Sequence, residues 1–327
     1  MRNKYISCYV AAFCAGLLST ACNDFLDEVP DNRTVIDTPE AVSELLVSAY
    51  PDANCVFFTE SMSDNVTDRG NTLDPYVQPD WNRANRQAFY WEDIDMTYQD
   101  SPNYFWMASY QAIAAANHAL EAIAELEAKG VDCSAQKGEA LLCRAYNHFM
   151  LVNVFAQHYN PAFAATDMGV AYVTEPEKEV FGHYERVSVK ETYDKIRKDL
   201  EEGLPLISNK AYGDTPKYHF TREAAQAFAC RFYLYVGEWQ KAIDAADEAL
   251  GDNPTLRNWN EYIQMSTANR EKNYTSVQES ANLLLASTVS QFAVDQSFYR
   301  YGYSTTVNNS LFQQNDNVVN GVWAYRE

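Results

Sequence analysis

Apolar residues recur at intervals of three and four through most of residues 38–254, the spacing of helices that bury one face. We predict helices at 38–50, 101–129, 134–159 and 188–203, followed by a helix pair within 221–254. Four of these helices start after a residue that caps exposed backbone amides: Thr38, Ser101, Ser188 and Thr221. The pattern therefore predicts a mainly α-helical chain.

The helix pair within 221–254 has the residue pattern of a tetratricopeptide repeat. Gly237 permits a sharp turn between antiparallel helices, and the small Ala242 and Ala246 allow them to approach closely. We expect Trp239, Ile243 and Leu250 to fill the groove between this pair and the next. Because one repeat cannot bury its own apolar face, we expect stacked helical hairpins, an α/α superhelix with long loop insertions. Residues 255–327 lack this periodicity and are predicted to be irregular and partly β.

Residues 51–100, between the first two predicted helices, form a long irregular stretch with the chemistry of a sugar site. A sugar ring has an apolar face that an aromatic plane covers, and hydroxyls that amides and guanidinium groups can hydrogen-bond. The candidate ligand-binding residues are Tyr76, Trp81, Asn82, Arg83, Asn85 and Arg86, together with Tyr301 from a second aromatic cluster near the C-terminus. The alternative is that the aromatic residues anchor the loop and the polar ones make turns.

Residues 1–22 predict an export signal that ends in a lipidated cysteine. Arg2 and Lys4 form a basic head, and the apolar run 10–18 is too short to span a bilayer. Small residues then precede Cys22, as at a lipoprotein signal-peptidase site. We therefore predict that residues 1–21 are removed and that acyl chains on Cys22 tether the mature protein to a membrane. The alternative is an ordinary secretory signal with an incidental cysteine.

Charge and composition narrow the choice of partners. The formal net charge is −20, and loss of the two cations Arg2 and Lys4 with the signal changes it to −22. So acidic a chain repels phosphate backbones, and nucleic acid is not expected as a partner. With 23 Tyr, 16 Phe and 6 Trp, some aromatic side chains should lie on the surface.

Motifs for catalysis or metal binding are not found in the sequence. It has no nucleophile elbow, phosphate loop or zinc-protease helix, and His148 and His158 lack the i, i+4 spacing that places two ligands on one helical face. We interpret both histidines as core or interface residues and expect no enzyme activity, cofactor or metal. A glycosidase would need two carboxylates across a cleft, an arrangement that sequence alone does not test.

Free buried thiols are expected at Cys55, Cys133, Cys143 and Cys230, with a disulfide between Cys133 and Cys143 as the alternative.

The segment that begins at Cys22 reads CNDFLDEVP and resembles the start of a mature SusD/RagB-type outer-membrane lipoprotein. The resemblance continues through the predicted helices to about residue 300. It implies an N-terminal helical domain at 22–254, with residues 255–327 as the incomplete start of a C-terminal ligand-binding region. It also implies that the N-terminal region contributes a stacking tryptophan, which we assign to Trp81.

The resemblance further implies a function. Such a protein is lipid-anchored at the cell surface, binds glycans or other oligomeric nutrients, and delivers them to a SusC-like TonB-dependent transporter in the outer membrane. The alternative is a tetratricopeptide-type scaffold whose groove binds protein and not sugar.

Overall fold

The computed structural model describes residues 36–70, 83–177, 182–214, 216–252, 254, 256–288, 290–292 and 300–303. Tyr76, Trp81, Asn82 and Cys22 thus lie outside the described residues. Asp37–Glu327 groups as one compact unit. Its α-helices are α3 (Pro39–Leu46), α4 (Val56–Ser61), α5 (Arg83–Phe89), α6 (Pro102–Ala128), α7 (Ser134–Phe155), α8 (Val189–Gly203), α9 (Arg222–Val236), α10 (Trp239–Leu250), α11 (Trp259–Gln264) and α12 (Thr267–Tyr274). Short 3-10 turns lie at η1 (Val47–Ala49), η2 (Leu204–Leu206), η3 (Asn209–Tyr212) and η4 (Pro216–Tyr218), and two strands are β1 (Val66–Asp68) and β2 (Tyr301–Tyr303).

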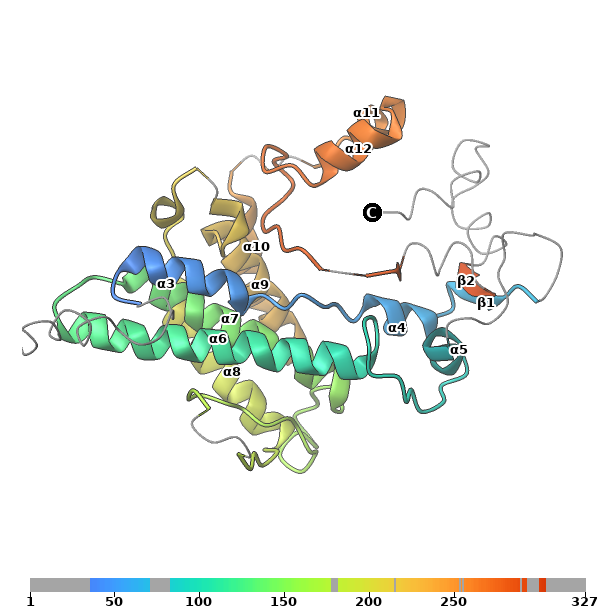
Figure 1. Ribbon diagram of the computed structural model, residues 1–327, viewed down its shortest axis with the longest axis horizontal. Helices are drawn as coiled ribbons and strands as arrows, with labels where there is room; N and C mark the ends of the chain where they lie inside the picture. Colours follow the sequence, from blue (N-terminus) through green and yellow to red (C-terminus); the bar gives the residue numbers. More distant parts are fainter. Residues whose placement is uncertain are drawn as a thin grey trace, which may run out of the picture. The chain divides into compact units, whose positions relative to one another are not determined.

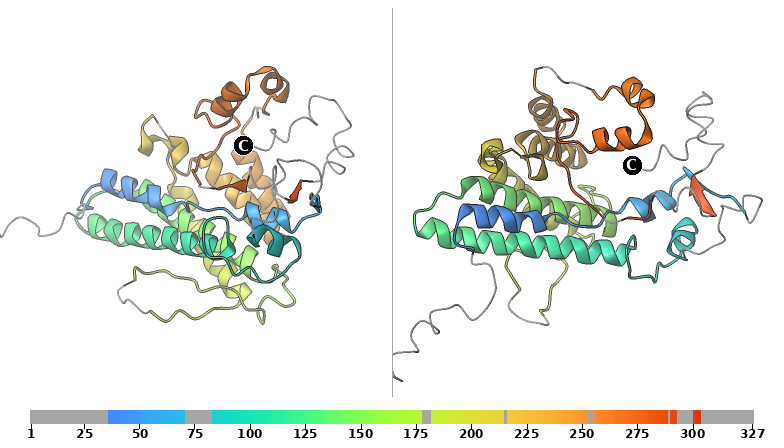
Figure 2. Two further views of the ribbon diagram at one scale, coloured as in Figure 1. Left: turned by 45° about the vertical axis from the view of Figure 1, so that its right-hand side comes forward. Right: turned by 45° about the horizontal axis from the view of Figure 1, so that its top comes forward.

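The long helices pack side by side in a layered helical body. α7 packs between α6 and α8, while α3 and η1 lie along α6 (Figures 1 and 2). The predicted starts are confirmed, since each capping side chain accepts a hydrogen bond from the amide three residues on: Thr38, Ser101, Ser188 and Thr221, at 3.0–3.1 Å. The mainly helical fold class is therefore confirmed. Within the described residues, no helix is both long enough and apolar enough to cross a bilayer.

α9 and α10 form the hairpin that the repeat pattern predicts. Gly237 has a φ of 78°, the left-handed conformation that glycine accommodates at a helix end. α10 buries Ala242 and Ala245 and packs on α9 through this small-residue face. The prediction that Trp239, Ile243 and Leu250 fill a groove was wrong, because each of these side chains is more than half exposed.

α7 and α8 approach closely because two glycines face each other between them. A Cβ on Gly138 of α7 would lie 2.9 Å from the Cβ of Leu206 and 3.0 Å from the carbonyl oxygen of Gly203, which ends α8. Contacts so short leave no room for a methyl group. These glycines therefore set the separation of the two helices.

A buried polar network fastens the segment after α7 to the helical body. Arg144 and Asp199 form a two-point ion pair at 2.6 and 2.8 Å, and the hydroxyl of Tyr172 donates to Asp199 at 2.6 Å. His148 is fully buried and its ring stacks on Tyr172 at 3.8 Å between centroids. The interpretation of His148 as a core residue is confirmed, but His158 lies beyond the end of α7 and is exposed.

The cysteine thiols at positions 55, 133, 143 and 230 are free. Cys133 and Cys143 are buried, whereas Cys55 and Cys230 are half-buried. Cys133 directly precedes α7 and Cys143 lies within it, so they are about 15 Å apart at a rise of ~1.5 Å per residue. A disulfide requires Cα atoms within about 7 Å, which excludes the alternative bridge between them.

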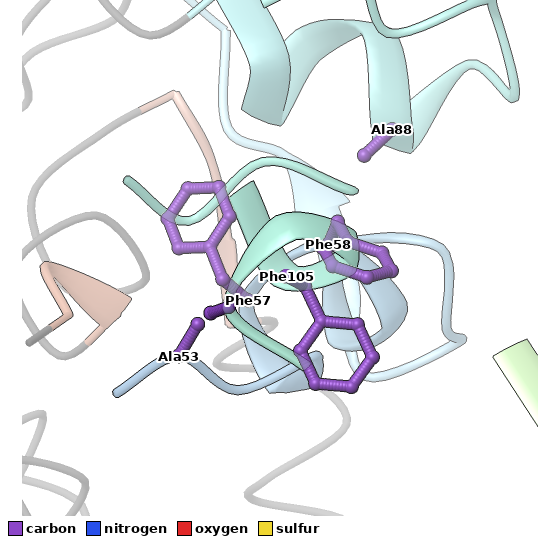
Figure 3. Packing of buried hydrophobic residues seen from close by; sticks show 6 residues of the cluster. Ala53, Phe57, Phe58, Ala88 and Phe105 are labelled. Carbon is purple, nitrogen blue, oxygen red and sulfur yellow. The ribbon is translucent and has the colours of Figure 1, made fainter. Parts of the chain in front are cut away.

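Residues 51–100 are not a continuous irregular loop as predicted, since they contain α4, β1 and α5. α4 contributes Phe57 and Phe58 to a cluster with Ala53, Ala88 of α5 and Phe105 of α6 (Figure 3). The rings of Phe58 and Phe105 lie 6.3 Å apart. This cluster holds α4 and α5 on the end of α6.

Candidate functional site

α5 ends in a Schellman motif, in which two amides beyond the helix bond back to its last turn. The N–H of Trp91 donates to the carbonyl of Ala88 at 3.1 Å, and that of Glu92 donates to Gln87 at 2.9 Å. This closure places Trp91 in the left-handed region, with a φ of 57°. Glycine usually occupies this position, because the Cβ of any other residue is strained there.

Neither the backbone conformation nor burial therefore favours a tryptophan at position 91. Trp91 is 73% exposed, so packing does not offset a backbone strain of about 1–2 kcal/mol. The neighbouring Tyr90 is also exposed, and its ring packs edge-on against Phe89 at 5.1 Å. A large exposed aromatic plane held by a rigid helix end is suited to stacking on a ligand.

Strands β1 and β2 support this helix end. They pair antiparallel, with Asp68 opposite Tyr301. The guanidinium of Arg300 binds both carboxylate oxygens of Asp68, at 2.6 and 2.7 Å, and these bonds lower the pKa of Asp68 below its usual range. The Tyr301 ring packs on Phe89 at 5.0 Å and on Tyr90 at 5.6 Å.

Two surface ion pairs join α5 to the segment that follows Trp91. Arg86 contacts Glu92 at 2.9 Å, and Arg83 contacts Asp95 at the same distance. Exposed pairs of this kind contribute about 0–1 kcal/mol to stability, so their groups can exchange partners with a ligand at little cost. We call Arg83, Arg86, Tyr90, Trp91, Glu92 and Asp95 the α5 surface.

The structure separates the sequence-predicted site residues into two kinds. Arg83 and Arg86 belong to the α5 surface. Asn85 is buried and donates to the hydroxyl of Ser61 at 3.2 Å, which fastens α5 to α4. Tyr301 is also buried, and burial raises its pKa to about 12, so its phenol stays neutral and packs within the supporting cluster.

Trp91 is the residue that sequence reasoning did not single out. It lies in the stretch where a sugar site was expected, but its residue type alone did not distinguish it from other aromatic residues there. A left-handed position is normally signalled by Gly or Asn, and neither occurs between residues 86 and 102. The backbone conformation of Trp91 was therefore not predictable from the local sequence.

The α5 surface joins an aromatic plane to paired cations and carboxylates. Such a combination can stack on the apolar face of a sugar ring and hydrogen-bond its hydroxyls. In the part of the chain that the structure describes, no cluster of three or more His, Cys, Asp or Glu residues is arranged to hold a metal ion.

Most of the described helical region matches a known protein family. A SusD-like family model with the description "Starch-binding associating with outer membrane" matches residues 24–234. This match covers well over half of the 327 residues. The chain belongs to the SusD-like family. No curated protein matches it.

Solved structures of SusD-like proteins share the fold. A superfamily member from Bacteroides thetaiotaomicron is 21% identical with a TM-score of 0.54, and the match covers 69% of this chain and 50% of that one. A member from Bacteroides vulgatus is 22% identical with a TM-score of 0.53, covering 71% and 51%. A structure titled "Laminarin binding SusD-like protein" is 21% identical with a TM-score of 0.52, covering 75% and 50%. This SusD-like chain thus spans about half the length of the solved relatives that it matches.

Proposed function

We propose that this chain binds glycans at the outer membrane and that Trp91 is the residue on which a sugar ring stacks. The observation that carries the proposal is the exposed tryptophan in a left-handed backbone conformation. Folding alone would favour glycine at position 91, so ligand binding best explains why a tryptophan occupies it. The family description, which names starch and the outer membrane, supports the same ligand class.

The α5 surface supplies the remaining chemistry of this proposed site. Trp91 covers the apolar face of the ring, while Arg86 and Glu92 exchange their mutual ion pair for bonds to ring hydroxyls. Arg83 and Asp95 extend the site in the same way. The sequence-predicted residues Tyr76, Trp81 and Asn82 directly precede α5 in the chain and stay proposed partners of this surface.

The cellular role that we propose follows the family. The mature chain is anchored through acyl chains on Cys22, faces the cell exterior, and delivers its glycan to a SusC-like TonB-dependent transporter. No catalytic step is part of this role. In this proposal residues 255–327 belong to the ligand-binding region that accompanies the helical domain.

Affinity electrophoresis on gels containing laminarin or starch tests the sugar site. Trp91→Ala should weaken binding about tenfold or more, because an aromatic stacking contact contributes about 0.5–1.5 kcal/mol beyond its buried area. Tyr98→Ala is the matched control, since Tyr98 is an exposed aromatic residue outside the α5 surface. Equal retention of the two variants would overturn the role of Trp91, and unretarded wild-type protein on a broad glycan panel would overturn sugar binding itself.

A second candidate function is protein binding, favoured by the uncovered apolar face of α10. Trp239, Ile243 and Leu250 project from this helix, each more than half exposed. Large apolar residues on one helix face are typical of contact surfaces. Cross-linking in intact cells with wild-type protein and Ile243→Asp tests this function. A partner lost only in the variant, with no glycan retention in the wild type, would favour the scaffold.

A further inference from the structure

A cavity of about 1040 Å³ lies away from the α5 surface, between η1, α6 and the C-terminal segment 285–287. Its lining includes the small, buried Ala108 and Ala112 of α6 and the half-exposed ring of Tyr218. The volume is at the upper end of that of ligand sites, which span roughly 300–1000 Å³. The space is thus large enough for several linked sugar units.

Hydrogen bonds hold the C-terminal wall of this cavity in place. The amide of Leu285 donates to the carbonyl of Lys217 at 2.7 Å, and the hydroxyl of Thr221 donates to the carbonyl of Leu283 at 3.1 Å. Directly after this wall segment, the side-chain amide of Asn54 donates to the hydroxyl of Thr288 at 3.1 Å. These bonds join residues that are far apart in the sequence, so the cavity is part of the folded structure.

A buried carboxylate orients a histidine at this cavity. Glu139 is fully buried, and one of its oxygens accepts from the hydroxyl of Tyr50 at 2.6 Å and from Nδ1 of His219 at 2.9 Å. The His219 ring also stacks on Tyr212, 4.0 Å between centroids. Because Nδ1 faces a carboxylate, it carries the proton, and Nε2 is the ring nitrogen left to meet a ligand. Tyr50 and His219 both line the cavity.

The lining chemistry selects the class of ligand. Ser48, Gln111 and Ser287 supply hydroxyl and amide groups, and Asp52 supplies a carboxylate. Among the described lining residues there is no Lys or Arg, so an anionic ligand would meet a carboxylate and no counter-charge. Uncharged polyhydroxyl groups fit these neutral donors and acceptors, and the Tyr218 ring offers a plane for stacking.

We propose that this cavity is a second glycan site, which takes an uncharged oligosaccharide with Tyr218 as the stacking residue and His219 Nε2 as a hydroxyl acceptor. The inference rests on the proposed function for its ligand class, but it uses none of the residues of the α5 surface. The two sites can therefore be tested separately.

Histidine-selective NMR locates the ligand directly. The chain has five His residues, so a spectrum of protein labelled with 15N-histidine is simple. On titration with laminarihexaose or maltohexaose, the His219 ring signals should shift, while those of the exposed His118 and His158 stay in place. Tyr218→Ala should weaken the affinity read at His219 about tenfold, whereas Trp91→Ala and the control Tyr98→Ala should leave it within about twofold.

The outcomes separate this inference from the proposed function. Glycan binding that Trp91→Ala abolishes, with His219 signals unmoved, overturns the second site and leaves the first intact. A wild-type chain that binds neither hexasaccharide at either surface overturns both. If the His219 signals changed with protein concentration in the absence of sugar, a second copy of the chain would occupy the cavity, and this outcome would overturn a glycan site. Gln111→Ala provides a second exposed variant should Tyr218→Ala not fold.

Discussion

The stability of the helical body should depend on pH, because the neighbours of His148 require one tautomer of its neutral ring. Its Nδ1 lies 2.8 Å from the carbonyl of Arg144, which can only accept, and its Nε2 lies 3.1 Å from the amide of Val173, which can only donate. The ring must therefore be neutral, with the proton on Nδ1. A second proton, on Nε2, would face the Val173 N–H, and the hydrogen bond from that amide to Nε2 would be lost. Burial lowers the pKa of His148 to about 3, and the nearby Arg144 cation opposes protonation further.

The sign and size of the pH effect follow from this shift. Above the ordinary value of 6.5, the ring is neutral in both the folded and unfolded states and contributes no pH dependence. Between pH 6.5 and about 3, the unfolded chain binds a proton at His148 that the folded chain does not, so stability falls as the pH falls. At about pH 4.5, two units below 6.5, the loss is about 3 kcal/mol at ~1.4 kcal/mol per unit.

Urea unfolding of wild type and His148→Gln at about pH 7.5 and 4.5 measures this effect. The glutamine does not titrate, so the stability advantage of wild type over the variant should shrink by about 3 kcal/mol between the two pH values. His158→Gln is the matched control, because the same change at an exposed position should leave the difference nearly constant. A wild-type advantage over His148→Gln that is equal at both pH values would show that folding does not lower the pKa of His148.

Three further substitutions test the packing and the site. Gly138→Ala should lower the free energy of unfolding by about 1–3 kcal/mol in urea titrations, because the new methyl meets the Leu206 Cβ at 2.9 Å; no change would show that the helices separate freely. Asp199→Asn should cost about 3–5 kcal/mol by the same assay, since it leaves the buried Arg144 without its counter-charge; a near-neutral result would contradict this. Trp91→Gly should raise stability by about 1 kcal/mol while it weakens glycan binding, measured by thermal unfolding and affinity gels; a less stable variant would mean that Trp91 packs usefully.

The helix starts were predictable because capping is local. A serine or threonine accepts from an amide three residues away, so Ser188 and Thr221 mark their helices with no reference to the rest of the chain. Gly237 was equally informative, since the left-handed turn that it makes depends on its missing Cβ. These elements needed only their own sequence.

The rest depends on contacts between distant residues. α4 and α5 have six and seven residues, too few for helical periodicity to show, and they are stabilised by packing on Phe105. Whether the apolar face of α10 is covered depends on what packs on it, which the sequence of α10 does not contain. His148 and His158 looked alike in the sequence, but only His148 has the segment at Val173 folded over it.

The two proposed glycan surfaces share one aromatic core. α5, which Trp91 follows, packs through Ala88 on the cluster around Phe57 and Phe58 (Figure 3). Ala108 of the same cluster lines the cavity. Close-packed side chains resist displacement, so this cluster keeps the spacing between the surfaces constant. A glycan long enough to reach both would bind more tightly than either surface allows alone, because its second contact is intramolecular. A steep rise in affinity at one chain length is therefore the sign that the two surfaces act together, and a gradual rise would mean that they bind separate chains.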